Sequence, residues 1–269
     1  MKKVLSVLLA VLMVFSVVTL FAACSKDTPE NVGTAESDLA YVQDKGKMVI
    51  GITEYAPMNY YEDTAKTILT GFDTEFAQAV CEKLGVEAEF IIIDWDNKWP
   101  ELEAKSIDAV WNGMTITDEV KANSSVTNAY VKNAQVVVMK ADVAANYTSL
   151  DQMTDLTFAV ESGSAGEGVL KDAGMGNYTA VVDQSAALME VESGSADACV
   201  IDITMAEAMT GEGTSYSDLA QAVSLNEEEY GIAFRTGSDL TAKVNEIMDE
   251  MKADGSLQAL ADKYSLSLV

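Results

Sequence analysis

The side chains that could do chemistry in this 269-residue sequence are carboxylates, hydroxyls, amides and aromatic rings, because the chain contains no histidine. Without histidine there is no Ser-His-Asp or Cys-His site, no usual zinc site and no common proton shuttle near neutral pH. Carboxylates alone can catalyse, but no cluster of closely spaced Asp and Glu lies in a glycine-rich turn. The sequence therefore favours reversible binding over catalysis, and we expect neither a metal nor a cofactor.

Two cysteines lie in the body of the chain. Cys81 and Cys199 each belong to an apolar periodic segment, and no CxxC spacing is present. This pattern indicates two buried, unpaired thiols and argues against metal or redox use. A disulfide between them stays open, because the sequence neither supports nor excludes it.

The charge of the chain is strongly negative, −26 at pH 7, with 17 Lys and Arg against 43 Asp and Glu. Nucleic acids and anionic lipid surfaces bind clustered basic side chains, so we expect no nucleic-acid partner. After the N-terminal region, no apolar run reaches the roughly 20 residues that a membrane span needs.

The N-terminal region has the parts of a secretory signal. Lys2 and Lys3 precede a mostly apolar stretch over residues 4–20, and two alanines then stand directly before Cys24. This boundary resembles the lipobox of bacterial lipoproteins, in which the cysteine carries the lipid, although Phe21 stands where an aliphatic residue is usual.

We therefore predict a signal peptide over residues 1–23, a lipid on Cys24 and a flexible polar tether over residues 24–38. The mature protein would be extracytoplasmic and anchored to the outer face of the membrane. An ordinary secretory signal with an incidental cysteine is the alternative.

Strands alternate with helices in the remaining 246 residues, which is typical of an α/β fold with mostly parallel sheets and a natural length for two lobes. Strands are expected at residues 47–52, 86–93, 107–111, 135–140, 157–160, 179–182, 197–201 and 230–234. One helix is expected to begin at Asp73, which can cap it, and another at Ser164. Further helices are expected at residues 100–105, 185–192, 239–253 and 257–264.

Several short motifs occur in an order and spacing that is similar to one protein family. They are Val49-Ile50-Gly51 with Tyr55-Ala56-Pro57, Gly71-Phe72-Asp73, Asp94-Trp95-Asp96, Ile107-Asp108-Ala109, Gly113 to Thr117, Ala198 to Asp202, Tyr230 to Arg235 and Lys252 to Gly255. From Lys47 to Tyr264 the chain resembles the family 3 solute-binding proteins of polar amino acid ABC importers.

The resemblance implies a two-lobed, periplasmic-binding-protein-like (type II) fold with two crossover segments and a ligand cleft between the lobes. The first lobe would comprise residues 39–133 and 230–269, and the second residues 134–229. Ligand would stabilise the closed form by touching both lobes. The expected partners are a small polar ligand, an amino acid or a relative, and the permease of the importer.

The resemblance also implies the ligand-binding residues. Tyr55 and Trp95 match aromatics that sandwich the ligand, and Asp202 matches the acid that binds its ammonium group. Backbone and hydroxyl donors would come from Asn112, Gly113, Thr115 and, at a helix N-terminus, Ser164. The alternatives are core aromatics for Tyr55 and Trp95, a plain turn at Asn112-Gly113, and helix caps at Ser164 and Asp202.

One departure from the family pattern concerns the ligand carboxylate. Val120 stands where the family has an arginine that pairs with this group, and Ala165 stands where a ligand-facing Thr is frequent. Arg235 is the only arginine in the sequence. Three explanations stay open: Lys121 or Lys98 supplies the charge, backbone N–H groups suffice, or the ligand lacks a free α-carboxylate.

A transport receptor without catalytic activity is the leading functional hypothesis. A ligand-sensing module for a receptor is one alternative. An enzyme on the same fold, such as a dehydratase, is another, and it would need a general acid or base beside the cleft.

Overall fold

The computed structural model describes residues 37–269. The predicted signal peptide, the predicted lipid on Cys24 and most of the predicted tether lie outside the described residues and stay predictions. Among residues 37–269, no helix has both the length and the apolar character that a membrane crossing requires.

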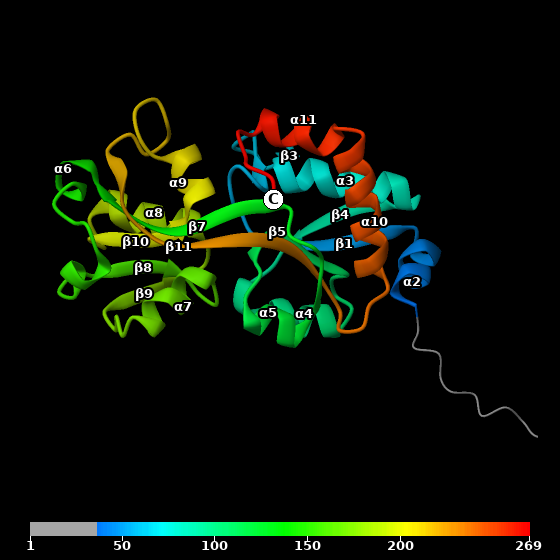
Figure 1. Ribbon diagram of the computed structural model, residues 1–269. Coiled ribbons are helices and arrows are strands. Elements are labelled where there is room, and N and C mark those ends of the chain that lie inside the picture. The colour runs from blue at the N-terminus through cyan, green and yellow to red at the C-terminus, as the bar shows by residue number, and fades with distance from the viewer. Residues whose placement is uncertain (1–36) are drawn as a thin grey trace, which may run out of the picture. The chain divides into compact units, whose positions relative to one another are not determined.

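Residues 37–269 form a mixed main sheet whose strands lie in the order β4-β1-β5-β11-β7-β10-β8-β9, with β6 paired to β11, and β2 and β3 form a separate two-stranded sheet. The elements gather in two groups, the first and the second lobe, joined by the long strands β7 and β11 (Figure 1). Within the first lobe, β4, β1 and β5 are parallel neighbours, and within the second, β10, β8 and β9 are parallel neighbours. The predicted two-lobed α/β fold is therefore confirmed.

The strands are short in the lobes and long between them. The first lobe contains β1 (Lys47–Ile52), β2 (Tyr60–Tyr61), β3 (Leu69–Thr70), β4 (Glu87–Ile92), β5 (Ala109–Thr115) and β6 (Ser125–Val126). The second contains β8 (Phe158–Glu161), β9 (Tyr178–Val181) and β10 (Ala198–Asp202). The connecting strands are β7 (Val131–Lys140) and β11 (Leu219–Phe234).

Helices cover both faces of the sheet in each lobe (Figure 1). The first lobe has α2 (Asp38–Lys45), α3 (Phe72–Leu84), the 3₁₀ helix η1 (Trp95–Asn97), α4 (Lys98–Glu103), α5 (Asp118–Asn123), α10 (Leu240–Ala253) and α11 (Ser256–Lys263). The second has α6 (Ala141–Ala144), the 3₁₀ helix η2 (Leu150–Met153), α7 (Ala165–Asp172), α8 (Gln184–Ser193) and α9 (Ile203–Met209).

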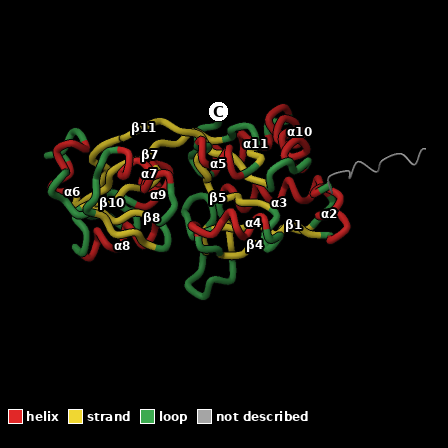
Figure 2. Tube along the Cα trace, turned by 90° about the horizontal axis from the view of Figure 1, so that it is seen from below, coloured by secondary structure: helices red, strands yellow, loops and turns green. Residues whose placement is uncertain are grey.

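The two connecting strands pair with each other in antiparallel fashion, from Val131 opposite Tyr230 to Lys140 opposite Leu219. Figure 2 shows β11 passing from one lobe to the other. Sequence analysis predicted only the apolar ends of these strands, at residues 135–140 and 230–234. The rest of β11 was not predicted, because residues 226–229 are Asn-Glu-Glu-Glu. This partly exposed segment lacks the apolar pattern by which a strand is recognised in a sequence.

The start of α3 differs from the prediction. Asp73 was expected to cap the helix, but the N-cap is Gly71, and Asp73 lies inside the first turn with its side chain fully buried. Gly71 has a φ of 123°, and a Cβ there would lie 2.2 Å from the carbonyl oxygen of Met58. A side chain has no room at this cap, so glycine begins the helix and Asp73 is free for a different role.

Cys81 and Cys199 are both buried and form no disulfide. Burial raises the pKa of the Cys81 thiol to about 12, which keeps it protonated and unreactive. The two thiols act as small apolar side chains of the core.

Candidate functional site

Two neighbouring hollows lie between the lobes. The larger is a cleft of about 1230 Å³, and the smaller is a cavity of about 20 Å³. Trp95, Thr115, Ser164 and Ala165 line both hollows, so the cavity lies at the inner end of the cleft. Of the predicted site residues, the cavity wall contains Trp95, Asn112, Gly113, Thr115, Ser164 and Asp202.

Asp202 ends β10 and is 3% exposed. Its carboxylate accepts hydrogen bonds from the side-chain amides of Asn133 at 2.5 Å, Gln135 at 2.6 Å and Gln184. Although Asp202 stands at the N-cap position of α9, its side chain makes no capping bond, so its carboxylate is not used to begin that helix. Burial raises the pKa of Asp202 to about 7, and the charge of Glu228 adds to the rise.

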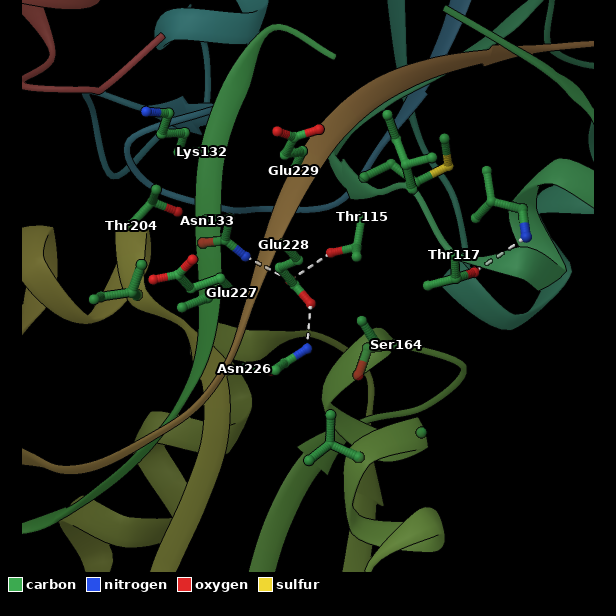
Figure 3. A pocket seen from close by; sticks show the side chains of 18 of the residues that line it. Thr115, Thr117, Lys132, Asn133, Ser164, Thr204, Asn226, Glu227, Glu228 and Glu229 are labelled. Atoms are coloured by element: carbon green, nitrogen blue, oxygen red, sulfur yellow. Dashed lines mark hydrogen bonds between the residues drawn. The ribbon is translucent and has the colours of Figure 1, made fainter. Parts of the chain in front are cut away.

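Glu228 on β11 brings a second carboxylate to the cleft, and it was not among the predicted site residues. Its Oε1 accepts from Thr115 Oγ1 at 2.6 Å, from Asn133 Nδ2 at 2.6 Å and from Gln135 Nε2 at 2.7 Å. Figure 3 shows Glu228 between Thr115 and Asn133, with Asn226 donating to its other oxygen at 3.2 Å. Thr115 thus contacts a carboxylate from the connecting strand.

Glu161 is the last residue of β8 and brings a third carboxylate to the site. Sequence analysis did not predict it as a site residue. It lines the small cavity, is 3% exposed, and its Oε1 has no hydrogen-bond partner among residues 37–269. Burial first, and then the charge of Asp202, raise the pKa of Glu161 well above its ordinary value. Glu161 could have been predicted from the order of the strands. Because β8 and β10 are parallel neighbours, their last residues, Glu161 and Asp202, lie at the same edge of the sheet.

Trp95 and Lys98 line the cleft from the first lobe. The Lys98 ammonium donates to the carbonyl oxygens of Trp95 and Gly163, each at 3.0 Å, and lies 5.0 Å from the centre of the Trp95 ring. Gly163 belongs to the second lobe, so this lysine bridges the cleft. Burial lowers the pKa of Lys98.

Tyr55 does not line the cavity. Its hydroxyl bonds to those of Thr204 and Tyr230, and its ring packs against Gly113, where a Cβ would lie 2.5 Å from a ring carbon. Tyr55 therefore stands among the buried aromatics behind the cavity wall, in contact with Thr204 of the second lobe.

Asn112 and Gly113 do not form the plain turn that was considered as an alternative. Strand β5 continues through both of them to Thr115. The Asn112 amide donates to Thr53 Oγ1 at 2.7 Å, and the Gly113 N–H donates to Asp73 Oδ2 at 2.6 Å. The backbone N–H of Gly113 is thereby already occupied by a carboxylate of its own lobe.

Ser164 caps α7, as its Oγ accepts from the N–H of Glu167 at 3.1 Å. The cap alternative therefore holds for Ser164, which lines the cavity at the same time. In the preceding turn, Ser162 Oγ donates to Asp96 Oδ2 of the first lobe at 2.6 Å. This bond and the Lys98–Gly163 bond hold the lobes together over the cavity.

No guanidinium reaches either hollow. Arg235 donates to the Asp38 carboxylate at 3.0 Å and to the carbonyl oxygen of Ile107 at 2.8 Å, inside the first lobe. Val120 is 5% exposed and packs in an apolar cluster with Trp95. Lys121 lines only the outer cleft and is exposed. The site as a whole offers carboxylates and amides, which suits reversible binding of a cation.

Within residues 37–269, no group of three His, Cys, Asp or Glu side chains is placed to hold a metal ion.

Comparison with known proteins gives a family and relatives. Residues 48–267 match the bacterial extracellular solute-binding proteins, family 3. The chain is 30% identical over 233 residues to the L-cystine-binding protein TcyJ of Escherichia coli (strain K12), covering 85% of this chain and 86% of that protein. Among solved structures, a mutant of ArgBP from T. maritima has a TM-score of 0.78 at 27% identity, over 84% of this chain and 98% of the other.

A further solved structure bears on the choice between receptor and enzyme. The ancestral amino acid-binding protein AncCDT-1, described as a precursor of cyclohexadienyl dehydratase, is 30% identical with a TM-score of 0.77. The similarity covers 85% of this chain and 99% of that one.

Proposed function

The chain belongs to family 3 of the bacterial extracellular solute-binding proteins, and on this premise we propose that it is the lipid-anchored receptor of an ABC importer. It captures an amino acid or a related amine-bearing solute between its lobes and delivers it to a membrane permease. The observation that carries the proposal is the cavity wall, which is built from both lobes and holds the buried carboxylate of Asp202.

The proposed lobe boundaries are residues 39–133 with 230–269, and residues 134–229. Their support is the pairing of β7 with β11, because β7 also pairs with β10 of the second lobe and β11 also pairs with β5 of the first lobe. These two antiparallel strands, with register shifts in β11 near Val223 and Asn226, offer the hinge at which the lobes separate.

The proposed contacts follow from the cavity wall. Asp202 binds the ligand ammonium, Trp95 covers the aliphatic part, and Asn112, Gly113, Thr115 and Ser164 shape the polar wall. Tyr55 acts from behind this wall through its hydroxyl bond to Thr204. Closure of the lobes buries the ligand, as the Ser162–Asp96 bond forms across the cleft.

The proposed location is the outer face of the cell membrane, through a lipid on Cys24. Its support is the sequence of residues 1–24, together with the extracellular character of the family. The proposed activity is binding without catalysis, and its support is the similarity to TcyJ, which is a binding protein.

A ligand screen by thermal unfolding tests the proposal. A ligand present at 100 times its Kd adds about 2.7 kcal/mol to the free energy of unfolding, enough to move the midpoint by several degrees. We expect such a shift from at least one amino acid or amine, and its loss in Asp202→Ala. Glu212→Gln is the control, because Glu212 is an exposed acid of the second lobe away from both hollows. No shift with any compound, or turnover of the bound one, contradicts the proposal.

A further inference from the structure

The unsatisfied polar atoms around the cleft are acceptors. Asn133 Oδ1 and Glu161 Oε1 are buried and have no donor among residues 37–269, and both residues line the ligand hollows. Buried acceptors of this kind are rare, and each calls for a donor from elsewhere. The other such atom, Trp111 Nε1, belongs to the core of the first lobe and lines neither hollow. A ligand rich in N–H groups supplies what both acceptors lack.

Acidic side chains outnumber basic ones in the hollows. Asp202 and Glu161 face the small cavity, and Glu228 shares donors with Asp202. The outer cleft is lined by seven acids and three lysines: Asp118, Glu119, Asp172, Glu207, Glu227, Glu228, Glu229, Lys98, Lys121 and Lys132. Clefts lined predominantly by one sign of charge concentrate ligands of the opposite sign. The excess of acids therefore favours a cation in the cleft.

Among residues 37–269, no cationic side chain lines the small cavity, where it could receive a ligand carboxylate. Lys98 already donates to two carbonyl oxygens and lies over the Trp95 ring, while Lys121 and Lys132 are exposed at the outer cleft. Arg235 is held by Asp38 in the first lobe. A zwitterionic amino acid would place its carboxylate near two buried carboxylates, without a cationic side chain as its partner.

The volume of the small cavity also indicates which part of the ligand it holds. About 20 Å³ is of the order that a single water-sized group fills. An ammonium group has that size, so the cavity holds one such group and the rest of the ligand lies in the cleft. The ligand's remaining atoms would pass Trp95, which lines both hollows, and reach the cleft.

From these contacts we propose that the ligand is a linear organic dication without a carboxylate, of the α,ω-diamine class. One ammonium lies in the cavity between Asp202 and Glu161, the methylene chain runs along Trp95, and the second ammonium lies among the acids of the cleft. The proposal rests on the proposed function as a solute receptor, and it assigns a ligand-binding role to Glu161.

Calorimetry with a matched series tests the ligand class on the full mature chain. The probes are α,ω-diamines of about three to six carbons, each paired with the monoamine of the same length and with the same diamine bearing an α-carboxylate, such as lysine for 1,5-diaminopentane. We expect the tightest diamine to bind at least about tenfold more tightly than both its partners. An advantage below about tenfold over either partner overturns the proposal.

Variants test the role of Glu161 separately. Glu161→Gln keeps the shape and removes the charge, and we expect the Kd of the best diamine to rise at least about tenfold while Glu212→Gln leaves it within about twofold. A folded Glu161→Gln protein, by thermal unfolding and circular dichroism, with unchanged Kd overturns the assignment; if it does not fold, the wild-type series alone decides the ligand class. Binding of a standard amino acid but of no diamine overturns this inference and leaves the receptor function standing, whereas binding of neither removes both.

Discussion

Asp202 and Glu228 accept hydrogen bonds from the same two amide groups. Asn133 Nδ2 lies 2.5 Å from Asp202 Oδ1 and 2.6 Å from Glu228 Oε1, and Gln135 Nε2 lies 2.6 Å and 2.7 Å from the same oxygens. Two carboxylates that share donors at this range do not both ionise without cost. Burial, and after it the charge of Glu228, raise the pKa of Asp202 to about 7, so Asp202 holds a proton near neutral pH that a bound cation can displace.

Ligand affinity should therefore depend on pH around neutrality. Below a pH of about 7, Asp202 is protonated in the free protein, and a cationic ligand must displace that proton. We expect the Kd for an amine ligand to rise as pH falls from 8 to 6, by up to about tenfold per pH unit below the pKa. Calorimetry in two buffers of different ionisation enthalpy should show proton release on binding at pH 7. A Kd that is constant from pH 6 to 8 would contradict the role given to Asp202.

Removing the charge of Glu161 should stabilise the free protein at alkaline pH. Its pKa is raised in the folded state, so the folded protein binds a proton more tightly than the unfolded chain, and the charged form opposes folding above the unfolded pKa. For Glu161→Gln we expect a free energy of unfolding higher than wild type by about 1 kcal/mol or more at pH 8, with the difference vanishing near pH 4.

Urea unfolding at the two pH values measures this difference, with Glu212→Gln as the control that stays at the wild-type value. A loss of stability at pH 8 would show that Glu161 supports the fold. Glu161 would then have a structural role in addition to any contact with ligand.

Truncation of Asp73 should destabilise the first lobe. Its carboxylate accepts from the N–H of Gly113 at 2.6 Å and from the hydroxyl of Tyr130 at 2.9 Å, and all of this network is buried. Asp73→Ala leaves two buried donors without an acceptor, and we expect a loss of about 2 to 4 kcal/mol in the free energy of unfolding. Asp249→Ala on the exposed face of α10 should change it by less than about 0.5 kcal/mol. Equal effects of the two substitutions would contradict this reading.

Asp73 also shows where sequence analysis reached its limit. The local pattern Gly-Phe-Asp before an apolar run indicates a helix start, and α3 does start there, but the partners of Asp73 lie 40 and 57 residues away in the sequence. Local patterns cannot reveal contacts of that separation. The apolar strands β1, β8 and β10 were predicted to within one residue because burial fixes their composition.

Of the acids around the cleft, local sequence patterns predicted one and did not predict the others. Asp202 was predicted because it stands at the end of a buried strand in a motif of the family, whereas for Glu161 only the following Ser-Gly-Ser matched a family motif. Glu228 stands in an acidic run that resembles a solvated loop until its pairing with β7 is known. The Arg235 side chain could be excluded from the site only once its bonds to Asp38 were seen.

The membrane anchor is tested by Cys24→Ala. If Cys24 carries a lipid, the wild-type protein should fractionate with membranes, and the variant should appear in the medium or retain its signal peptide. Cell fractionation with intact-mass measurement distinguishes these outcomes, and Cys81→Ala is the matched control because that thiol is buried in the first lobe. An unchanged mass and location in Cys24→Ala would show that the N-terminal region is an ordinary secretory signal.

Placing an arginine at position 120 should change the ligand preference of the cleft. Val120 lies on α5, lines the cleft and packs in the cluster that contains Trp95. A guanidinium there would offer the bidentate partner that a carboxylate needs and would add one positive charge to an acidic cleft. For Val120→Arg we therefore expect the affinity for lysine, relative to 1,5-diaminopentane, to rise at least about tenfold.

Val120→Met is the matched control for that experiment, because it lengthens the side chain without adding charge and should leave the ratio within about twofold. Calorimetry gives the two affinities, and thermal unfolding shows that each variant is folded. The physical reason for the expected change is local: the carboxylate of lysine gains a partner, while the second ammonium of the diamine meets a like charge. If folded Val120→Arg shows the wild-type ratio, the cleft already accommodates a carboxylate without an arginine, and the acids around Asp202 do not set the class of ligand.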